Sequence, residues 1–339
     1  MSLLQDFDKA SKLILQTGGV VSVQGTRGIG KTMLCRSLAA AAAGNNMPAA
    51  FIDAELARGI AGPPAAVSMA MIGSPEDLDK QTAHSSFFIG DIIPAGHTAG
   101  YIFGLLSMIG TAKRKGARLT VIDSCGWMDY PGVVLAKQNE IEMTNPDYVI
   151  CLQRSHESEF IITPFIKRAD ICCSVKQAPA ASRYSPDIAK ANFRADMFRC
   201  LRGSRQHLLQ FSQVTFTNTW IGSGRELKWQ YLKAISRILS APVYHGEQVG
   251  KNLYLLTDAE CSEQQQSEIS SMLKTGRVIT TKPGFLENLY IGLEDEESRL
   301  LAVGTLKTVN FEKRQLIVES PLLTVQPVKN IRFGFISFP

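Results

Sequence analysis

One segment near the N-terminus constrains the fold more than any other part of the chain. Residues 25–32 read Gly-Thr-Arg-Gly-Ile-Gly-Lys-Thr and fit the phosphate-binding pattern G-x-x-x-x-G-K-[ST]. The apolar run before it, residues 19–24, predicts a buried strand, and the Ala- and Leu-rich run after it, residues 33–43, predicts a helix. This order directs backbone N–H groups and a helix N-terminus at an anion. The sequence therefore predicts a nucleoside triphosphate site.

The residue types in this loop suit that chemistry. Glycines permit positive φ and let N–H groups surround the β-phosphate. Lys31 supplies a positive charge for the β- and γ-phosphate oxygens, and the Thr32 hydroxyl is placed to bind Mg²⁺. The predicted nucleotide-binding residues are Gly25, Thr26, Arg27, Gly28, Ile29, Gly30, Lys31, Thr32 and Met33.

Two further apolar runs end in acids. Residues 49–53 end at Asp53, and residues 119–123 end at Asp123 in the manner of a Walker B segment. Glu55 lies two positions after Asp53, so both side chains face the same way if the strand stays extended. Carboxylates there can accept a substrate proton or hold a metal's water shell. We predict Thr32, Asp53 and Asp123 as Mg²⁺ ligands, the alternative being solvated carboxylates at strand ends.

Strand and helix patterns alternate through the first 200 residues or so. Residues 87–91 and 148–152 predict further strands, while residues 4–17 and 101–112 predict helices. Such alternation is typical of a parallel sheet. The predicted fold class is therefore α/β, with a P-loop NTPase-type parallel sheet flanked by helices.

The character of the chain changes from residue 171 onward. Residues 178–182 resemble a linker, and a helical run carrying Arg194 and Arg199 follows. Arginines on a mobile helix could neutralise charge on a transferring phosphoryl group, although a solvated basic helix gives the same pattern. We predict an arginine-bearing lid over about residues 171–203. Short strands separated by charged turns then predict a smaller β-rich domain, so the expected domains are residues 1–206 and 207–339.

Bulk properties agree with two ordinary domains. The chain has 339 residues, of which 45% are hydrophobic and 20% charged, as in globular proteins. The net charge of +5 permits an anionic partner such as a nucleic acid without requiring one. The seven cysteines form no C-x-x-C pair, and no apolar run is long enough for a membrane span. We expect reduced thiols, no membrane partner and a cytoplasmic location.

The ordered motifs resemble those of the P-loop polynucleotide 5′-hydroxyl kinases, the group that includes the kinase of the pre-mRNA cleavage complex and the nucleolar pre-rRNA kinase. The family's D-x-D-x-G-Q segment is similar to residues 53–58, and its T-x-G-W is similar to residues 124–127. An arginine-bearing lid resembles residues 194–203, and the β-rich remainder resembles the family's closing domain. Glu55 stands where the family has aspartate, and Arg58 where it has glutamine.

The resemblance implies an enzyme that transfers the γ-phosphate of ATP, with Mg²⁺, to the 5′-hydroxyl of single-stranded or end-exposed RNA, and DNA as well. The implied catalytic residues are Lys31, Asp53, Glu55, Arg194 and Arg199, with Glu55 as the base. The implied substrate-binding residues are Ser124, Gly126 and Trp127, with Trp127 stacking on the terminal base; from its position alone, Trp127 could equally be ordinary core. RNA-processing proteins are the implied partners. Two alternatives stay open: an ATP-binding scaffold of an RNA-processing complex, and a P-loop kinase of a small hydroxylated metabolite.

Overall fold

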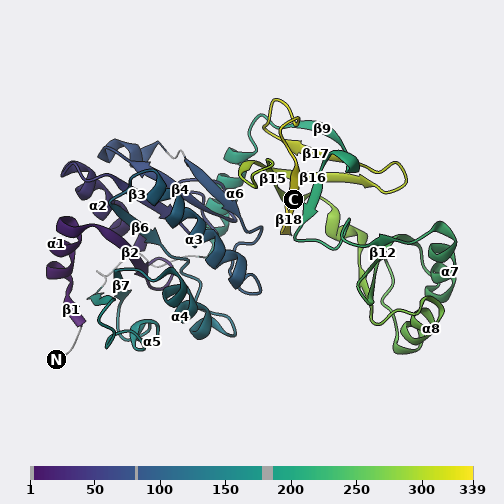
Figure 1. Ribbon diagram of the computed structural model, residues 1–339, viewed down its shortest axis with the longest axis horizontal. Helices are drawn as coiled ribbons and strands as arrows, with labels where there is room; N and C mark the ends of the chain where they lie inside the picture. The colour runs from purple at the N-terminus through teal and green to yellow at the C-terminus, as the bar shows by residue number, and fades with distance from the viewer. Residues whose placement is uncertain (1–3, 81–82, 178–185, 339) are drawn as a thin grey trace. The chain divides into compact units, whose positions relative to one another are not determined.

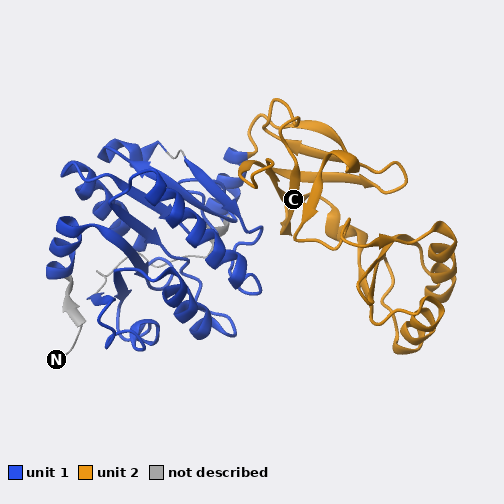
Figure 2. Cartoon of the chain, in the orientation of Figure 1, with its two compact units in different colours: residues 1–200 blue, residues 201–339 orange. Residues whose placement is uncertain are grey.

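The chain forms two compact units. A computed structural model describes residues 4–80, 83–177 and 186–338, and the chain divides into residues 1–200 and 201–339 (Figure 2). The linker-like residues 178–182 lie outside the described residues. The division falls near the expected boundary at 206/207, and strand β9 (Arg205–Gln210), which spans that boundary, pairs with β17 (Gln315–Ser320) of the second unit.

The first unit is built on an eight-stranded sheet with the order β1-β8-β7-β2-β6-β3-β4-β5 (Figure 1). Its strands are β1 (Leu4–Asp6), β2 (Gly19–Gln24), β3 (Ala49–Asp53), β4 (Ala66–Ile72), β5 (Ser85–Phe88), β6 (Leu119–Asp123), β7 (Tyr148–Gln153) and β8 (Cys172–Gln177). The strand that enters the phosphate loop, β2, lies between β7 and β6 and is parallel to both. The loop therefore leaves the sheet at its centre.

Two parts of the sheet differ from the sequence-based expectation. β4 pairs antiparallel with both β3 and β5, because the described residues that join it to these strands lack the α-helix that a parallel crossover needs. The predicted lid was to begin at residue 171, but residues 172–177 form β8 inside the sheet, where Cys173 and Ser174 are buried. Among the described residues, helix α6 (Pro186–Cys200) and the turn after it are the part that corresponds to the predicted lid.

Helices cover both faces of this sheet. The core on one face contains α1 (Phe7–Thr17) and α2 (Lys31–Gly44); the cores on the other contain α3 (Thr98–Arg114), α4 (Val133–Thr144) and α5 (Glu159–Ile162). Alternate residues of one strand supply the two cores, so that Phe51 packs with the α2 side and Ile52 with the α3 side. Burial on both faces explains why the strands appear in the sequence as continuous apolar runs.

The second unit contains two smaller sheets, in agreement with the β-rich domain expected. A six-stranded sheet has the order β10-β18-β15-β16-β17-β9, and a four-stranded sheet has the order β11-β12-β13-β14. Their remaining strands are β10 (Thr215–Thr217), β11 (Arg225–Glu226), β12 (Val243–Val249), β13 (Asn252–Thr257), β14 (Val278–Thr281), β15 (Leu289–Glu294), β16 (Leu300–Asn310) and β18 (Asn330–Ser337).

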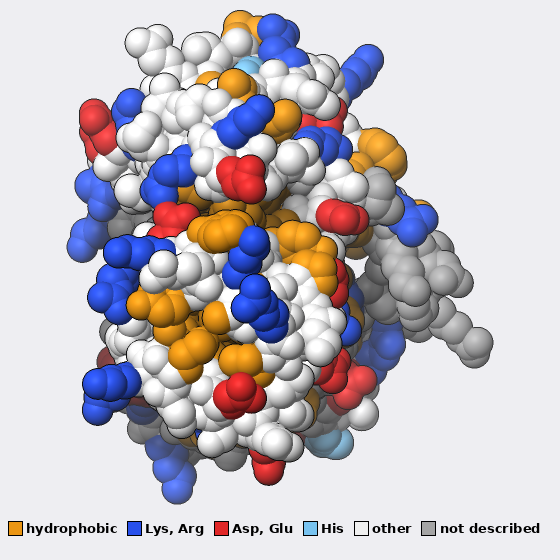
Figure 3. Space-filling model, turned by 90° about the vertical axis from the view of Figure 1, so that its right-hand side faces the viewer, with side chains coloured by type: hydrophobic (Ala, Val, Ile, Leu, Met, Phe, Trp, Pro, Cys, Tyr) orange, Lys and Arg blue, Asp and Glu red, His pale blue; other side chains and the backbone are white. Residues whose placement is uncertain are grey.

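Helices α7 (Trp229–Leu239) and α8 (Glu263–Leu273) accompany the four-stranded sheet. Stacked rings connect this sheet to the six-stranded one: the ring of His245 lies 4.2 Å from that of Phe311 and 5.8 Å from that of Trp220, centroid to centroid. Basic and hydrophobic side chains are interspersed on the face of the molecule shown in Figure 3. Within the described ranges, no helix is long and apolar enough to span a membrane.

Candidate active site

The phosphate loop has the backbone conformation that its glycines predict. Gly25, Gly28 and Gly30 have φ values of +139°, +70° and +101°. Gly30 immediately precedes α2, so its left-handed conformation turns the chain from the loop into the helix. The first N–H groups of α2 have no partner within the helix and point toward the loop, as an anion site requires.

Lys31 and Gly126 lie against each other across the loop. The Lys31 side chain is buried, and its Nζ donates a hydrogen bond to the Thr26 carbonyl at 3.1 Å. A Cβ atom added at Gly126 would lie 2.4 Å from Lys31 Nζ and 3.0 Å from the backbone nitrogen of Arg27. Position 126 therefore has no space for a side chain without moving the loop's lysine.

Asp53 and Asp123 end neighbouring parallel strands in direct register. Asp123 Oδ2 accepts a hydrogen bond from the Thr32 hydroxyl at 2.5 Å. Asp53 Oδ2 accepts hydrogen bonds from the backbone N–H groups of Ile60 and Ala61, at 2.8 and 3.0 Å. The other oxygen of each carboxylate is buried without a hydrogen-bond partner among the described residues. The structure thus brings together the three side chains predicted to bind a metal.

These two carboxylates hold protons more tightly than an ordinary aspartate. Burial, followed by repulsion from Asp123, raises the pKa of Asp53 to about 7. Burial likewise raises the pKa of Asp123 to about 6, although Lys31 and the Thr32 hydroxyl act in the opposite direction. Two buried carboxylates with unpartnered oxygens, beside a phosphate loop, fit a hard cation that would be bound both by these carboxylates and by phosphate oxygens.

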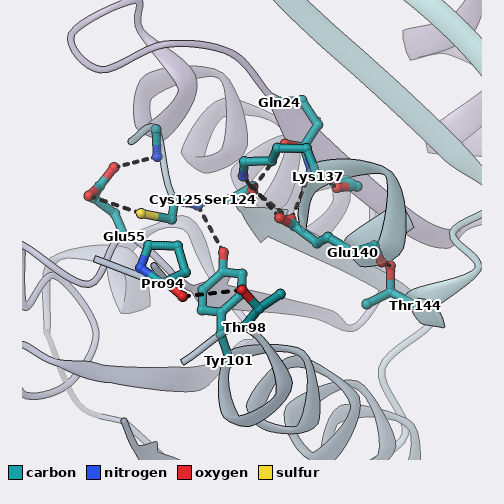
Figure 4. Close-up of polar contacts among 12 residues, drawn as sticks. Gln24, Glu55, Pro94, Thr98, Tyr101, Ser124, Cys125, Lys137, Glu140 and Thr144 are labelled. Atoms are coloured by element: carbon teal, nitrogen blue, oxygen red, sulfur yellow. Dashed lines mark hydrogen bonds and ion pairs between the residues drawn. The ribbon is translucent and has the colours of Figure 1, made fainter. Parts of the chain in front are cut away.

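The Glu55 carboxylate is oriented by a backbone N–H group beside the phosphate loop. Strand β3 ends at Asp53, so the extended-strand geometry does not reach Glu55. Its Oε2 accepts a hydrogen bond from the Gly126 N–H at 2.9 Å, and its Oε1 accepts one from the Cys125 thiol at 3.7 Å (Figure 4). Oε1 also lies 3.6 Å from the Arg27 guanidinium. Glu55 is buried, and its charge contributes to raising the pKa of Asp53. The two acids are thus close together but are held by different parts of the backbone.

Trp127 is half-buried beside the same loop. The Arg27 guanidinium lies 4.5 Å from the centroid of its ring, and its Nε1 donates a hydrogen bond to the Asp129 carbonyl at 3.3 Å. The ring also packs against the core below α3. The sequence left open whether Trp127 is a core residue or a stacking surface for a base. Its position is compatible with both, because the ring packs against the core and also borders the loop.

The structure corrects the prediction for Ser124. This side chain is fully buried, and its hydroxyl donates a hydrogen bond to Glu140 Oε1 at 2.6 Å (Figure 4). Lys137 Nζ donates to the Ser124 hydroxyl at 2.6 Å and to Glu140 Oε2 at 2.9 Å, while the Gln24 amide donates to Glu140 Oε1 at 2.8 Å. Ser124 therefore faces the protein interior and is not placed to contact a substrate.

Sequence reasoning missed this buried network, which consists of Gln24, Ser124, Lys137 and Glu140. It also missed Tyr101, whose hydroxyl accepts a hydrogen bond from the Cys125 N–H at 3.0 Å. A lysine and a glutamate three positions apart on a helix are typical of a solvated face, so their pattern gave no signal of burial.

The side chains of the other predicted residues contribute less clearly to the site. Ile29 packs in the core, so only its backbone is available to a nucleotide, whereas the Met33 side chain is 76% exposed. On α6, Arg194 and Arg199 are both exposed, but Arg199 also donates a hydrogen bond to the Gly59 carbonyl and forms an ion pair with Asp196 at 3.1 Å. The two lid arginines therefore have different environments in this structure.

The central strand, the glycine loop and the acids at the ends of β3 and β6 define a P-loop nucleoside-triphosphate-binding protein. The chain matches the model of the mRNA cleavage and polyadenylation factor CLP1 P-loop family over residues 25–199, just over half of its length. It belongs to that family. As a P-loop kinase family, it implies that the chain binds ATP.

Relatives agree with this assignment, and a solved structure agrees with the fold. The chain is 26% identical over 322 residues to the polyribonucleotide 5′-hydroxyl-kinase of Pyrococcus horikoshii, covering 94% of this chain and 86% of the relative. It is 24% identical over 341 residues to the enzyme of that name from Methanocaldococcus jannaschii, covering 98% and 89%. A solved structure of Clp1p with Pcf11p superposes with a TM-score of 0.60 at 14% identity, covering 97% of this chain and 77% of that one. The last comparison supports the fold alone.

Proposed function

We propose that this protein is an ATP-dependent polynucleotide kinase that transfers the γ-phosphate of ATP to the 5′-hydroxyl of RNA, and of DNA as well. Relatives of that activity at similar length, together with the P-loop family, support the proposal. The observation that carries it is the convergence of Glu55 and Trp127 on one edge of the phosphate loop: Gly126 orients the first, and Arg27 contacts both.

The residues on this edge have separate roles in the proposed reaction. Glu55 accepts the proton of the attacking 5′-hydroxyl, and its hydrogen bond to Gly126 sets the direction in which the carboxylate points. Trp127 stacks on the terminal base, which holds the hydroxyl near Glu55. Lys31 stabilises negative charge on the transferring phosphoryl group.

Mg²⁺ is the metal that we propose for the reaction. Thr32 and Asp123 would hold it beside the phosphates, with Asp53 binding it directly or through water. When bound there, the ion would neutralise charge on the β- and γ-phosphates. The buried, unpartnered oxygens of Asp53 and Asp123 support this assignment because a cation would compensate their burial.

The first experiment measures transfer of labelled γ-phosphate from ATP to matched 5′-hydroxyl RNA and DNA oligonucleotides, with Mg²⁺ and with EDTA. We expect transfer by the wild type that is lost on chelation and falls by about 100-fold or more in Lys31→Ala and in Glu55→Gln. No transfer by a folded, ATP-binding wild type would overturn the proposal and favour an ATP-binding scaffold. Transfer to nucleosides as efficient as to oligonucleotides would instead favour a metabolite kinase.

The proposed role of Arg194 has its own test. Its exposed position on α6 is suited to a group that meets the phosphoryl group only in the transition state. Arg194→Ala should therefore lower kcat by about 100-fold and change the KM for ATP by no more than about twofold. Parallel losses in both constants would assign Arg194 to ground-state binding.

A further inference from the structure

Helix α6 is attached to the turn that follows β3 by a group of polar contacts. Asp196 Oδ2 accepts a hydrogen bond from the Gly59 N–H at 3.1 Å and lies 3.4 Å from Arg58 Nε. Asp196 Oδ1 pairs with Arg199 at 3.1 Å, and Arg199 in turn donates to the Gly59 carbonyl. We call these four residues, Arg58, Gly59, Asp196 and Arg199, the lid clamp.

The lid clamp is centred on a largely buried carboxylate and is not a simple surface ion pair. The Asp196 side chain is only 13% exposed, and both of its oxygens are engaged. Gly59 presents its N–H and its carbonyl to the same helix. A Cβ atom at Gly59 would lie 2.6 Å from the Gly62 carbonyl oxygen, so the turn is too tight for any other residue. The side chains of Arg58 and Arg199 are 42% and 41% exposed, so Asp196 is the shielded member of the clamp. Hydrogen bonds to a charged group that is shielded from water are stronger than exposed ones.

The turn held by the clamp also holds Asp53. The two residues after Gly59 are Ile60 and Ala61, whose N–H groups donate to Asp53 Oδ2. The position of α6 is thus connected to that of Asp53 through one short piece of backbone. Any movement of this turn changes both.

Helical geometry then gives the two lid arginines different tasks. Arg199 is three positions from Asp196 and lies on the same face of α6, against the turn. Arg194 is two positions from Asp196, about 200° around the helix, so it lies on the opposite face, where it is also exposed. Anchoring one face of α6 fixes the direction of the other.

We propose that Asp196 and Arg58 are positioning residues of the phosphoryl-transfer site: they hold α6 on the Asp53 turn and so set the place of Arg194. This proposal rests on the proposed kinase function and assigns a task to Arg58, which replaces the glutamine that the resemblance leads us to expect. Arg199 acts here as an anchor, through Gly59, and not at the phosphoryl group.

The test compares Asp196→Ala, Arg58→Ala and their double variant with the control Asp79→Ala, which removes an exposed ion pair to Arg36 elsewhere in the same unit. The first measurement is hydrogen exchange of the backbone amides of residues 191–200. Exchange should accelerate by about 10-fold or more in Asp196→Ala, and less in Arg58→Ala, because loss of the clamp lets α6 open locally. The control should leave it unchanged.

The second measurement is steady-state phosphate transfer from ATP to 5′-hydroxyl RNA. Asp196→Ala should lower kcat by about 10-fold or more and leave the KM for ATP within about twofold. The double variant should be no worse than Asp196→Ala, since both substitutions remove one set of contacts. Arg58→Lys, which keeps the charge, should restore most of the loss seen in Arg58→Ala.

Unchanged exchange of α6 in Asp196→Ala would overturn the proposal, whatever the kinetics. Equal losses in kcat and in affinity for ATP would also overturn it, because they would indicate general damage to the site. A wild type without kinase activity contradicts the proposed function only; the exchange measurement still decides whether the clamp holds α6.

Discussion

Two clusters of buried polar side chains meet where strand β6 ends, one containing Asp123 and the other containing the next residue, Ser124. They differ in whether their polar atoms have hydrogen-bond partners. In the network of Ser124, Lys137 and Glu140, each charged group has an opposite charge and at least two hydrogen bonds. In the pair Asp53 and Asp123, each carboxylate has one oxygen without a partner among the described residues. Two consecutive residues, Asp123 and Ser124, thus belong to clusters of opposite kind.

The difference separates a structural role from a binding role. A buried network that is fully paired stabilises one arrangement of the chain and has no capacity for a ligand. Buried carboxylates with unpartnered oxygens cost free energy until something neutralises them. Removing a residue should therefore have opposite effects on stability in the two groups, which the next three experiments test.

The largest effect is expected in the paired network. Lys137→Met leaves Glu140 buried without its counter-charge and should lower the free energy of unfolding by about 3–5 kcal/mol. Hydrogen exchange of the slowest amides of β2 and β6 measures this in the first unit alone. The double variant Lys137→Met/Glu140→Leu should regain most of the loss, because no charge is left unpaired. A loss below about 1 kcal/mol in the single variant would show that the pair is not buried in solution.

An effect of opposite sign is expected at Asp53. Its pKa is raised from 3.8 to about 7, so the folded protein binds the proton more tightly than the unfolded chain does. The contribution of this group to the stability of the metal-free protein is therefore lost as the pH rises from about 4 to about 7. Asp53→Asn should raise the free energy of unfolding at pH 8 by on the order of 2 kcal/mol and have little effect below pH 4.

Denaturant unfolding in EDTA at a series of pH values measures this difference between Asp53→Asn and the wild type. The amide oxygen of the substituted side chain can still accept from the N–H groups of Ile60 and Ala61, so the turn should keep its hydrogen bonds. A destabilised variant at pH 8 would mean that the charge of Asp53 is already compensated within the protein, and the contrast with Lys137 would fail.

The smallest effect is expected at Ser124. Ser124→Ala removes one hydrogen bond to Glu140 and one from Lys137, and should cost about 1.5 kcal/mol of stability while the KM for RNA stays within about twofold. Ser124→Thr, which keeps the hydroxyl, is the matched control. A clear rise in the KM for RNA with unchanged stability would return Ser124 to the substrate-binding residues.

The sequence predicts those parts of the site that depend on residues close together in the chain. The glycine loop, Thr32 and the acids that end β3 and β6 follow from a motif and from apolar runs, and the register of two parallel strands brings them together. Lys137 and Glu140 escaped prediction because α4 has no clear apolar face, and a buried ion pair looks like a solvated one in sequence. Only the tertiary structure shows that both side chains are buried.

The fold, like the site, was predicted only in part. The α/β class, the central strands and a β-rich second part follow from the pattern, whereas the antiparallel pairing of β4 does not, because residues 66–72 are as apolar as a parallel strand. The lid clamp was also beyond prediction, since it joins Arg58 to Asp196 across 138 positions through backbone groups of Gly59. Contacts of that separation leave no local signature.

The contact between Arg27 and Trp127 bears on the fluorescence of the protein. Of the three tryptophans, only Trp127 lies in the first unit, and its ring faces a guanidinium that belongs to the phosphate loop. A charge at that distance affects the emission of an indole, so displacement of Arg27 toward incoming phosphates would change the fluorescence of this one residue. With Trp220 and Trp229 replaced by phenylalanine, the protein would report nucleotide binding without any attached label.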